Sequence, residues 1–319
     1  MNRRSLDIAP PDIRRWRAGN TGADYVWRFD SGVPGPQVMV QALTHGNELC
    51  GALVLDSLLA HGTRPARGVL TVAFANVAAF ERFDPAAPHR SRYVDEDYNR
   101  VWADDVLDGP RDSVELRRAR ELRPFVDQAD YLLDIHSMED ACRPIMVCGV
   151  AGRGGEKSAA FARRVGVPAD LLIDTGHPAG MRMIERGAFG DPQDPRTAIL
   201  IECGQHWERS APDVAHDTVL RFLRTTGTLE AADVYPLLRL PAPAVQRTIR
   251  VTEAVVARSP AFRFVAPVRG LQVVPRRGDP IATDGEHVVA APYDDTVLVM
   301  PSTAHCKAGN TMVRLGRYE

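Results

Sequence analysis

Two short motifs in the first half of the chain combine histidine and carboxylate side chains at spacings that suit a metal ion. In Thr44-His45-Gly46-Asn47-Glu48, the imidazole of His45 and the carboxylate of Glu48 are three residues apart. In Asp134-Ile135-His136-Ser137, a second histidine stands at position 136. Two histidines and one glutamate with an open fourth position are the ligands of catalytic zinc in metallohydrolases. The sequence therefore predicts a zinc site at His45, Glu48 and His136.

Each of these motifs lies where an apolar run, which predicts a strand, comes to its end. Residues 38–43 lead into the first motif, and residues 131–135 lead into the second. Gly46 permits a tight turn between the first histidine and the glutamate. Ligands of open α/β sheets bind at the carboxyl ends of strands, so we expect both motifs to meet there.

A third motif is strongly charged and runs from Arg92 to Arg100, with the sequence RYVDEDYNR. The pair Asn99-Arg100 offers an amide and a planar guanidinium, which suit a substrate carboxylate. The alternative is a solvated charged loop. That alternative has weight because all but Lys157 and Lys307 of the 39 basic residues are arginine.

A fourth motif places Glu202 directly after the apolar run 197–201. A carboxylate at the end of a buried strand, partly removed from water, is a candidate general base whose pKa is set by burial and a nearby metal. The alternative is a glutamate that caps a helix or forms a salt bridge.

The elements that must position these side chains alternate between strands and helices. This alternation predicts an α/β fold, with a mainly parallel mixed sheet and helices on both faces. The predicted strands are 38–43, 69–75, 131–135, 145–150, 171–174 and 197–201, and the predicted helices are 49–60, 113–128, 155–165 and 213–227, with Ser113 as an N-cap.

The pattern changes near Tyr235-Pro236. The following residues form short apolar runs separated by glycine, proline and aspartate, which is typical of an all-β region. We therefore predict a catalytic domain over 1–236 and a smaller β-rich domain over 237–319.

Composition excludes several classes of protein. The 319 residues are 45% hydrophobic and carry a formal net charge of −2, which suits a protein with a globular core and not a basic nucleic-acid binder. No apolar run approaches the ~18 residues of a membrane helix, and no apolar segment follows the basic N-terminus as in a secretory signal. The five cysteines are odd in number and widely spread, so we expect reduced thiols in a cytoplasmic protein.

Taken together and in this order, the four motifs resemble the aspartoacylase/succinylglutamate desuccinylase family, relatives of the zinc carboxypeptidases. The resemblance rests on Thr-His-Gly-Asn-Glu at 44–48, RYVDEDYNR at 92–100, Asp-Ile-His at 134–136 and Glu-Cys-Gly at 202–204. It covers most of the chain, including the β-rich part. It implies a zinc carboxypeptidase-like fold and hydrolysis of the amide bond of a small N-acylated amino acid.

The resemblance also implies roles around the metal. His45, Glu48 and His136 match the ligands of one Zn²⁺ per chain. Asp97 matches the carboxylate that orients the first histidine. Glu202 matches the general base that activates the zinc-bound water.

On the substrate side, the resemblance implies that Arg92 polarises the scissile carbonyl and that Asn99 and Arg100 clamp the substrate carboxylate. A further family arginine, which reads a carboxylate on the acyl side, should precede Glu202. Arg182, Arg186 and Arg196 all stand in that region, and we favour Arg186.

Some features stay open at this stage. The acyl group and the amino acid are not determined, because the chain departs from the family pattern after Glu202 and in the C-terminal region, where His305 stands in a segment expected to hold a tyrosine. His206 is a candidate for the pocket wall. The alternatives to a deacylase are a zinc carboxypeptidase acting on peptides and a non-catalytic zinc-binding homologue. We expect a small-molecule substrate and no nucleic-acid or membrane partner, and a homo-oligomer is compatible with the sequence.

Overall fold

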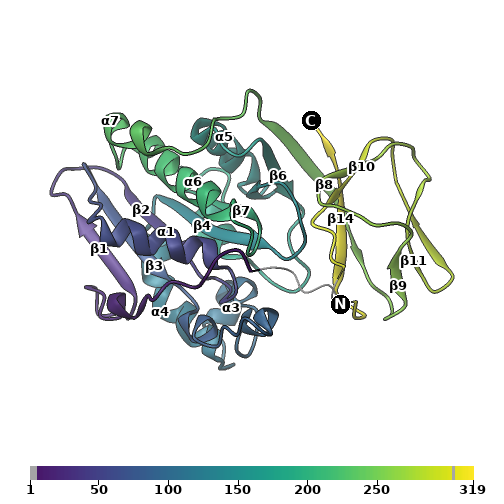
Figure 1. The fold of residues 1–319 in the computed structure, drawn as a ribbon, viewed down its shortest axis with the longest axis horizontal. Helices are drawn as coiled ribbons and strands as arrows, with labels where there is room; N and C mark the ends of the chain where they lie inside the picture. Colours follow the sequence, from purple (N-terminus) through teal and green to yellow (C-terminus); the bar gives the residue numbers. More distant parts are fainter. Residues whose placement is uncertain (1–5, 304–305) are drawn as a thin grey trace.

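The computed structural model describes residues 6–303 and 306–319, which form a large mixed sheet covered by helices and a small separate sheet (Figure 1). Within these residues the large sheet has 11 strands in the order β1-β3-β2-β4-β7-β5-β6-β8-β14-β13-β10. The bounds of these strands are β1 (Val26–Asp30), β2 (Gln37–Ala42), β3 (Val69–Phe74), β4 (Tyr131–Met138), β5 (Ile145–Val150), β6 (Asp170–Asp174), β7 (Thr197–Gln205), β8 (Arg247–Val256), β10 (Gln272–Val274), β13 (Thr296–Val299) and β14 (Thr311–Tyr318).

The remaining elements are the small sheet, in the order β12-β11-β9, and the helices. The strands are β9 (Phe262–Phe264), β11 (Pro280–Asp284) and β12 (His287–Ala290). The α-helices are α1 (Leu49–Ala60), α2 (Val77–Phe80), α3 (Asp104–Leu107), α4 (Val114–Gln128), α5 (Gly155–Val165), α6 (Ala211–Thr225) and α7 (Ala231–Val234). Short 3₁₀ turns are η1 (Arg14–Trp16), η2 (Pro88–Ser91), η3 (Tyr98–Arg100), η4 (Met183–Glu185), η5 (Gly187–Gly190) and η6 (Tyr235–Leu237).

The predicted α/β class with a mixed sheet is confirmed. Strands β3, β2, β4 and β7 are parallel neighbours, whereas β1 and β5 pair antiparallel with β3 and β7. The strand β1 and the short strands β9 and β11 were not predicted. The hydroxyl of Ser113 accepts the backbone N–H of Leu116 at 3.0 Å, as expected of the N-cap of α4.

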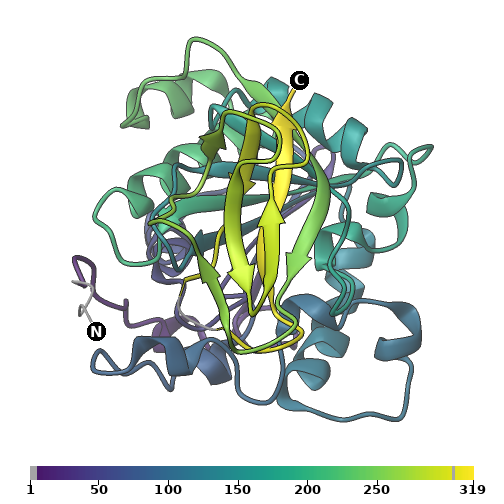
Figure 2. The ribbon, with the colours of Figure 1, turned by 90° about the vertical axis from the view of Figure 1, so that its right-hand side faces the viewer.

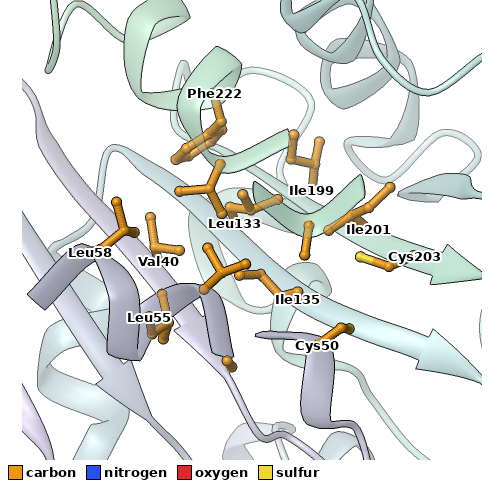
Figure 3. Packing of buried hydrophobic residues seen from close by; sticks show 14 of the residues in the cluster. Val40, Cys50, Leu55, Leu58, Leu133, Ile135, Ile199, Ile201, Cys203 and Phe222 are labelled. Atoms are coloured by element: carbon orange, nitrogen blue, oxygen red, sulfur yellow. The ribbon is translucent and has the colours of Figure 1, made fainter. Parts of the chain in front are cut away.

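The sheet has a hydrophobic layer on each face, because side chains alternate along a strand. Val40, Leu133 and Ile199 point toward α1 and α6, where they pack against residues such as Leu55 and Phe222 (Figure 3). Their neighbours Met39, Leu132 and Ala198 point the other way and belong to a second cluster with residues of α4. Burial of each large apolar side chain contributes about 1.5–3 kcal/mol, so these two layers hold the strand ends in place.

Two strands continue further than the apolar runs that predicted them. β4 extends to Met138 and β7 to Gln205, so His136 and Glu202 lie inside paired strands instead of after them. The two residues are direct register partners across the parallel β4–β7 pair. Backbone pairing continues through these polar positions, which side-chain hydropathy alone does not reveal.

The main sheet also runs across the predicted boundary at residue 236. β8 pairs in parallel with β6, and β14, β13 and β10 extend the sheet further. These strands and the small sheet stand together at one end of the molecule, in front of the other strands when viewed from that end (Figure 2). A third hydrophobic cluster, including Phe262, Leu298 and Leu315, holds them together. Within the described ranges, the helices are all too short or too polar to cross a bilayer.

Candidate active site

The three predicted metal ligands come together in the structure. The potential ligand atoms of His45, Glu48 and His136 lie within 4.8 Å of one another, and all three residues are buried. Nδ1 of His45 is 2.7 Å from Oε1 of Glu48, and Nδ1 of His136 is 3.0 Å from Oε2 of the same carboxylate. Oε2 of Glu48 is shut off from solvent without a well-formed hydrogen bond. This arrangement suits a small cation that takes one atom from each residue.

In both imidazoles, the ring nitrogen that does not face Glu48 contacts an aspartate. Nε2 of His45 is 3.1 Å from Oδ1 of Asp97, and Nε2 of His136 is 2.7 Å from Oδ2 of Asp134. A carboxylate on the far ring nitrogen is the usual support of a histidine that binds a metal. Asp97 therefore contacts the histidine that the sequence predicted. Asp134 was not assigned this role, although its position two residues before His136, on the same face of a strand, was a usable signal.

The turn that carries His45 and Glu48 is fixed by close backbone packing. Leu43, at the end of β2, adopts a φ of 60°, an unusual conformation for a leucine that turns the chain into the site. A Cβ atom added to Gly46 would lie 2.4 Å from the backbone of Ala79 and 2.5 Å from the carbonyl oxygen of Ser91. The indole N–H of Trp207 donates to the backbone oxygen of Asn47 at 3.1 Å. Glycine is thus required at position 46 by close approach.

The charges of this group stabilise one another. Burial opposes ionisation of Glu48, but the two imidazoles outweigh burial and hold the pKa of this carboxyl well below its usual range. Burial likewise opposes protonation of His136, and the adjacent Asp134 and Glu48 raise the pKa of its imidazole well above the usual value. Glu48 is therefore an anion, as a metal ligand must be.

Glu202 differs from Glu48 and Asp97 because no ion pair joins it to a side chain in the described part of the chain. Its Oε2 atom is buried and makes no hydrogen bond to the described residues. Burial raises the pKa of Glu202 to about 8; Glu48 adds to this effect, whereas His136 and Arg92 oppose it. A carboxyl group with a pKa near neutrality is suited to accept and return a proton.

These groups line one cavity of about 230 Å³. Arg92 reaches it from the 92–100 segment, with Nη2 at 2.9 Å from Nε2 of His45 and 3.0 Å from Oδ2 of Asp97. The C-terminal part of the chain contributes further walls, which include Gly270, Met300, Pro301, Ser302 and Arg314.

The predicted carboxylate clamp also faces this cavity. Oδ1 of Asn99 accepts the backbone N–H of Met183 at 3.1 Å, so only its Nδ2 can be offered to a ligand. One Nη of Arg100 donates to the backbone oxygen of Asn99 at 2.6 Å. Burial lowers the pKa of Arg100 to about 10; Asp97 counteracts this, whereas Arg92 and two further arginines, 182 and 314, add to it.

Arg186, the favoured reader of an acyl-side carboxylate, does not line the cavity. Its guanidinium contacts two carboxylates that do not line the cavity: Nε lies 2.7 Å from Oδ1 of Asp127, and Nη1 lies 2.7 Å from Oδ1 of Asp104. The 3₁₀ turn η4 separates it from Arg182, which does line the cavity and pairs with Asp174 at 2.9 Å.

One arginine that lines the cavity, Arg314, was not predicted from the sequence. Arg314 lies on β14 and is only 8% exposed, and its Nε lies 3.4 Å from Oδ1 of Asp174. No well-formed hydrogen bond engages that Nε within the described part of the chain. The many arginines of this sequence gave no signal that would single out this one.

The spare histidines have different positions. His206 lines the cavity, with Nδ1 at 2.9 Å from Oγ of Ser137, and burial lowers the pKa of its imidazole to about 3. His177 is a loop residue whose Nδ1 accepts the N–H of Ala179 at 3.1 Å. His305 lies outside the described residues. Cys203 faces away from Glu202 into the core, and all five cysteines are free.

The fold and this cavity define the class of protein, an α/β protein with a two-histidine, one-glutamate group at the ends of its central strands. The catalytic-domain model of the succinylglutamate desuccinylase/aspartoacylase family matches residues 34–226, more than half of the chain. The chain belongs to this family, whose members are deacylating hydrolases of acyl amino acids. Among proteins with curated annotation, none matches it by sequence.

Solved structures show the same fold. The succinylglutamate desuccinylase of Vibrio cholerae matches with a TM-score of 0.69 and 17% identity, over 92% of this chain and 85% of that one. The succinylglutamate desuccinylase of Chromobacterium violaceum matches with a TM-score of 0.64 and 19% identity, over 93% and 89%. The product-bound ectoine utilization protein EutE (DoeB) of Ruegeria pomeroyi matches with a TM-score of 0.62 and 16% identity, over 89% and 86%.

Proposed function

We propose that this protein is a zinc-dependent deacylase that hydrolyses the amide bond of a small N-acylated amino acid. The observation that carries the proposal is the convergence of His45, Glu48 and His136 on one point, in the same cavity as Glu202, whose buried Oε2 makes no hydrogen bond to the described residues. Zinc held by such a ligand set lowers the pKa of a water toward ~7 and polarises a carbonyl oxygen.

The residues around the metal group would then have separate roles in the hydrolysis. The carboxylate of Glu202 accepts a proton from the attacking water and returns it to the departing amine. The guanidinium of Arg92 stabilises the negative charge that develops on the scissile carbonyl oxygen, and it is held in place by Asp97. Asp97 and Asp134 keep the two imidazoles oriented.

The rest of the cavity fixes the substrate. The Nδ2 of Asn99 and the guanidinium of Arg100 hold the carboxylate of the amino acid, which places the amide carbon for attack. Arg182 pairs with Asp174 and Glu185, and Arg314 lies near Asp174; these two guanidinium groups are our candidates to bind a second carboxylate on the substrate. In place of Arg186, Arg182 is thus our candidate for the arginine that reads the acyl side.

Size favours a small substrate over a peptide. The cavity of about 230 Å³ is partly closed by residues such as Met300 and Pro301 from the C-terminal part, which we propose narrows the entrance. A peptide needs an open groove beyond the reacting bond. The five free thiols suit a reducing compartment such as the cytoplasm.

The test is a hydrolysis screen with zinc supplied. N-acetyl, N-succinyl and N-formyl amino acids are compared with dipeptides, and the zinc content per chain is measured in parallel. The proposal expects about one zinc per chain and release of a free amino acid from an N-acyl substrate. Cleavage of peptides alone would identify a carboxypeptidase. Bound zinc without any turnover would identify a non-catalytic homologue. In either case the deacylase assignment is wrong.

A further inference from the structure

A buried carboxylate that takes no part in the proposed mechanism holds the backbone of the 92–100 segment. Glu115, in the first turn of α4, is fully buried. Its Oε1 accepts the N–H of Val94 at 2.7 Å, and its Oε2 accepts the N–H groups of Asp95 and Glu96 at 3.0 and 3.2 Å. Three successive backbone N–H groups that converge on one point form an anion-binding concavity, and here the anion belongs to the protein itself.

Two further hydrogen bonds support the contact between Glu115 and the 94–96 backbone. Nδ2 of Asn76 donates to Oε1 of Glu115 at 2.9 Å, and the backbone N–H of Asn76 donates to the oxygen of Leu43, next to the His45 turn. In the other direction, Oδ2 of Asp95 accepts the N–H of Val114 at 2.8 Å, at the first residue of α4. Glu115 therefore connects the helix, the end of β3 and the 94–96 backbone.

The segment held in this way carries the polar groups of the site on both sides of the anchor. Arg92 lies two residues before it, and Asp97 follows directly, with Asn99 and Arg100 beyond. These side chains have no strand or long helix of their own, because the segment contains only the short turn η3. Three successive backbone N–H groups that donate to a single carboxylate thus anchor the loop between η2 and η3.

We infer that Glu115 is a positioning residue, which sets the placement of Arg92, Asp97, Asn99 and Arg100 in the cavity through the 94–96 backbone. The catalytic roles of those four residues rest on the proposed function, whereas the anchoring itself does not. Glutamine at this position keeps the size of the side chain but turns one acceptor oxygen into a donor. That donor would face backbone N–H groups, so the segment must shift.

The experiment compares Glu115→Gln with two variants on the same helix. Ser113→Ala removes the N-cap of α4 and so destabilises the helix start without touching the 94–96 backbone. Glu121→Gln removes an exposed carboxylate that pairs with Arg118. Hydrogen exchange at the amides of residues 92–100 reports the anchoring independently of any activity.

We expect faster exchange over 92–100 in Glu115→Gln, by about tenfold or more, and unchanged exchange there in both controls. We also expect kcat/KM to fall by about 10²-fold, as for a small misplacement of catalytic groups. The parent enzyme should prefer a substrate with a free carboxylate over its amide analogue. This preference should shrink in Glu115→Gln and persist in Ser113→Ala, even where the two variants are equally destabilised.

The inference is overturned if exchange over 92–100 is unchanged in Glu115→Gln, or if exchange rises while the carboxylate preference stays intact. A parent enzyme that hydrolyses no N-acyl amino acid would refute the proposed function, and the exchange data would still decide the anchoring. If Glu115→Gln does not fold, Asp95→Ala takes its place. That variant changes an exposed side chain, removes only the bond to Val114, and should loosen the same amides to a smaller extent.

Discussion

The carboxylate of Asp134 lies 2.7 Å from Nε2 of His136, two residues further along the same strand. It also accepts the hydroxyl of Thr44 at 2.8 Å, and all three residues are buried. The strand backbone thus holds His136, a candidate metal ligand, and its supporting carboxylate in a fixed relation.

Asp134→Asn should weaken metal binding by about 10- to 100-fold, the usual cost of losing the support of a metal-binding histidine. Competition with a chelator measures this affinity. Asp170→Asn is the matched control, because Asp170 is an equally buried aspartate that pairs with Arg143 and Arg247, away from the cavity. Equal metal affinities in parent and Asp134→Asn would show that Asp134 does not support the site.

Glu202→Gln should keep its metal and its fold but lose turnover. The amide is nearly the same size as the carboxyl group, yet it cannot accept a proton, so kcat should fall by about 10²–10⁴-fold. KM should change much less, because Asn99 and Arg100 are untouched. A metal-free variant would instead make Glu202 a ligand, and a variant of near-parent activity would move the base elsewhere, with His206 the next residue to test.

In the metal-free protein, the free energy of unfolding should depend on pH through the titration of Glu202. Burial raises the pKa of this carboxyl from 4.5 to about 8. Between these values the folded protein holds a proton that the unfolded chain has released, so the contribution of Glu202 to stability is present below the unfolded pKa and is lost as the pH rises toward 8. In urea unfolding of chelator-treated protein, Glu202→Gln should therefore lose less stability than the parent between pH ~5 and ~8. Parallel pH profiles for the two proteins would contradict this.

Arg314→Gln should act on substrates with two carboxylates. Loss of a charge-assisted contact of about 1.5–3 kcal/mol corresponds to roughly 10- to 100-fold in kcat/KM. If Arg314 contacts a carboxylate on the amino-acid side chain, kcat/KM should fall for N-acetylaspartate. If it contacts a carboxylate on the acyl group, kcat/KM should fall for an N-succinyl derivative of a neutral amino acid. N-acetylleucine, which has one carboxylate, should be hydrolysed as by the parent. Arg317→Gln, an exposed position on the same strand, serves as the control. An equal loss on all three substrates would show that Arg314 maintains the cavity and does not read a second carboxylate.

Arg186→Ala should lower stability without lowering kcat/KM on a good substrate. The change removes two ion pairs to Asp127 and Asp104, both of which remain in contact with water, so we expect a loss of about 1–3 kcal/mol in the free energy of unfolding. Arg182→Ala, measured in the same assays, should instead reduce kcat/KM. A specific effect of Arg186→Ala on substrate capture would return this arginine to the site.

The fold and the convergence of His45, Glu48 and His136 were the most predictable features of this molecule. The helix predicted at 49–60 is α1 with the same bounds, because its apolar residues recur at helical spacing and Ala60 is followed by His61 and Gly62. His45, Glu48 and His136 could be predicted since each follows or closes an apolar strand. A parallel arrangement of those strands then brings their ends together.

The arginines of the cavity wall and the anchor of the 92–100 segment were less predictable, for physical reasons. Arg186 and Arg182 are four residues apart in a segment without regular strands, and only the turn η4 decides which of the two faces the cavity. Arg314 comes from a strand 112 residues after Glu202, by the difference of their numbers. Glu115 resembles an ordinary first-turn glutamate in the sequence, because three of its four hydrogen-bond donors are backbone N–H groups, which carry no sequence signature.

The β6–β8 pairing also constrains how the cavity can open. Hydrogen bonds between these strands join Asp170–Ile173 to Arg247–Arg250 within one continuous sheet. A hinge between the catalytic part and the C-terminal strands would have to break this ladder, so the two parts cannot swing apart as rigid bodies. If the cavity opens for a substrate, the movement would fall to lining segments outside this ladder, such as residues 139–142 and 300–302. Under the proposed function, rearrangement of these short stretches would then bound the rate of entry and release.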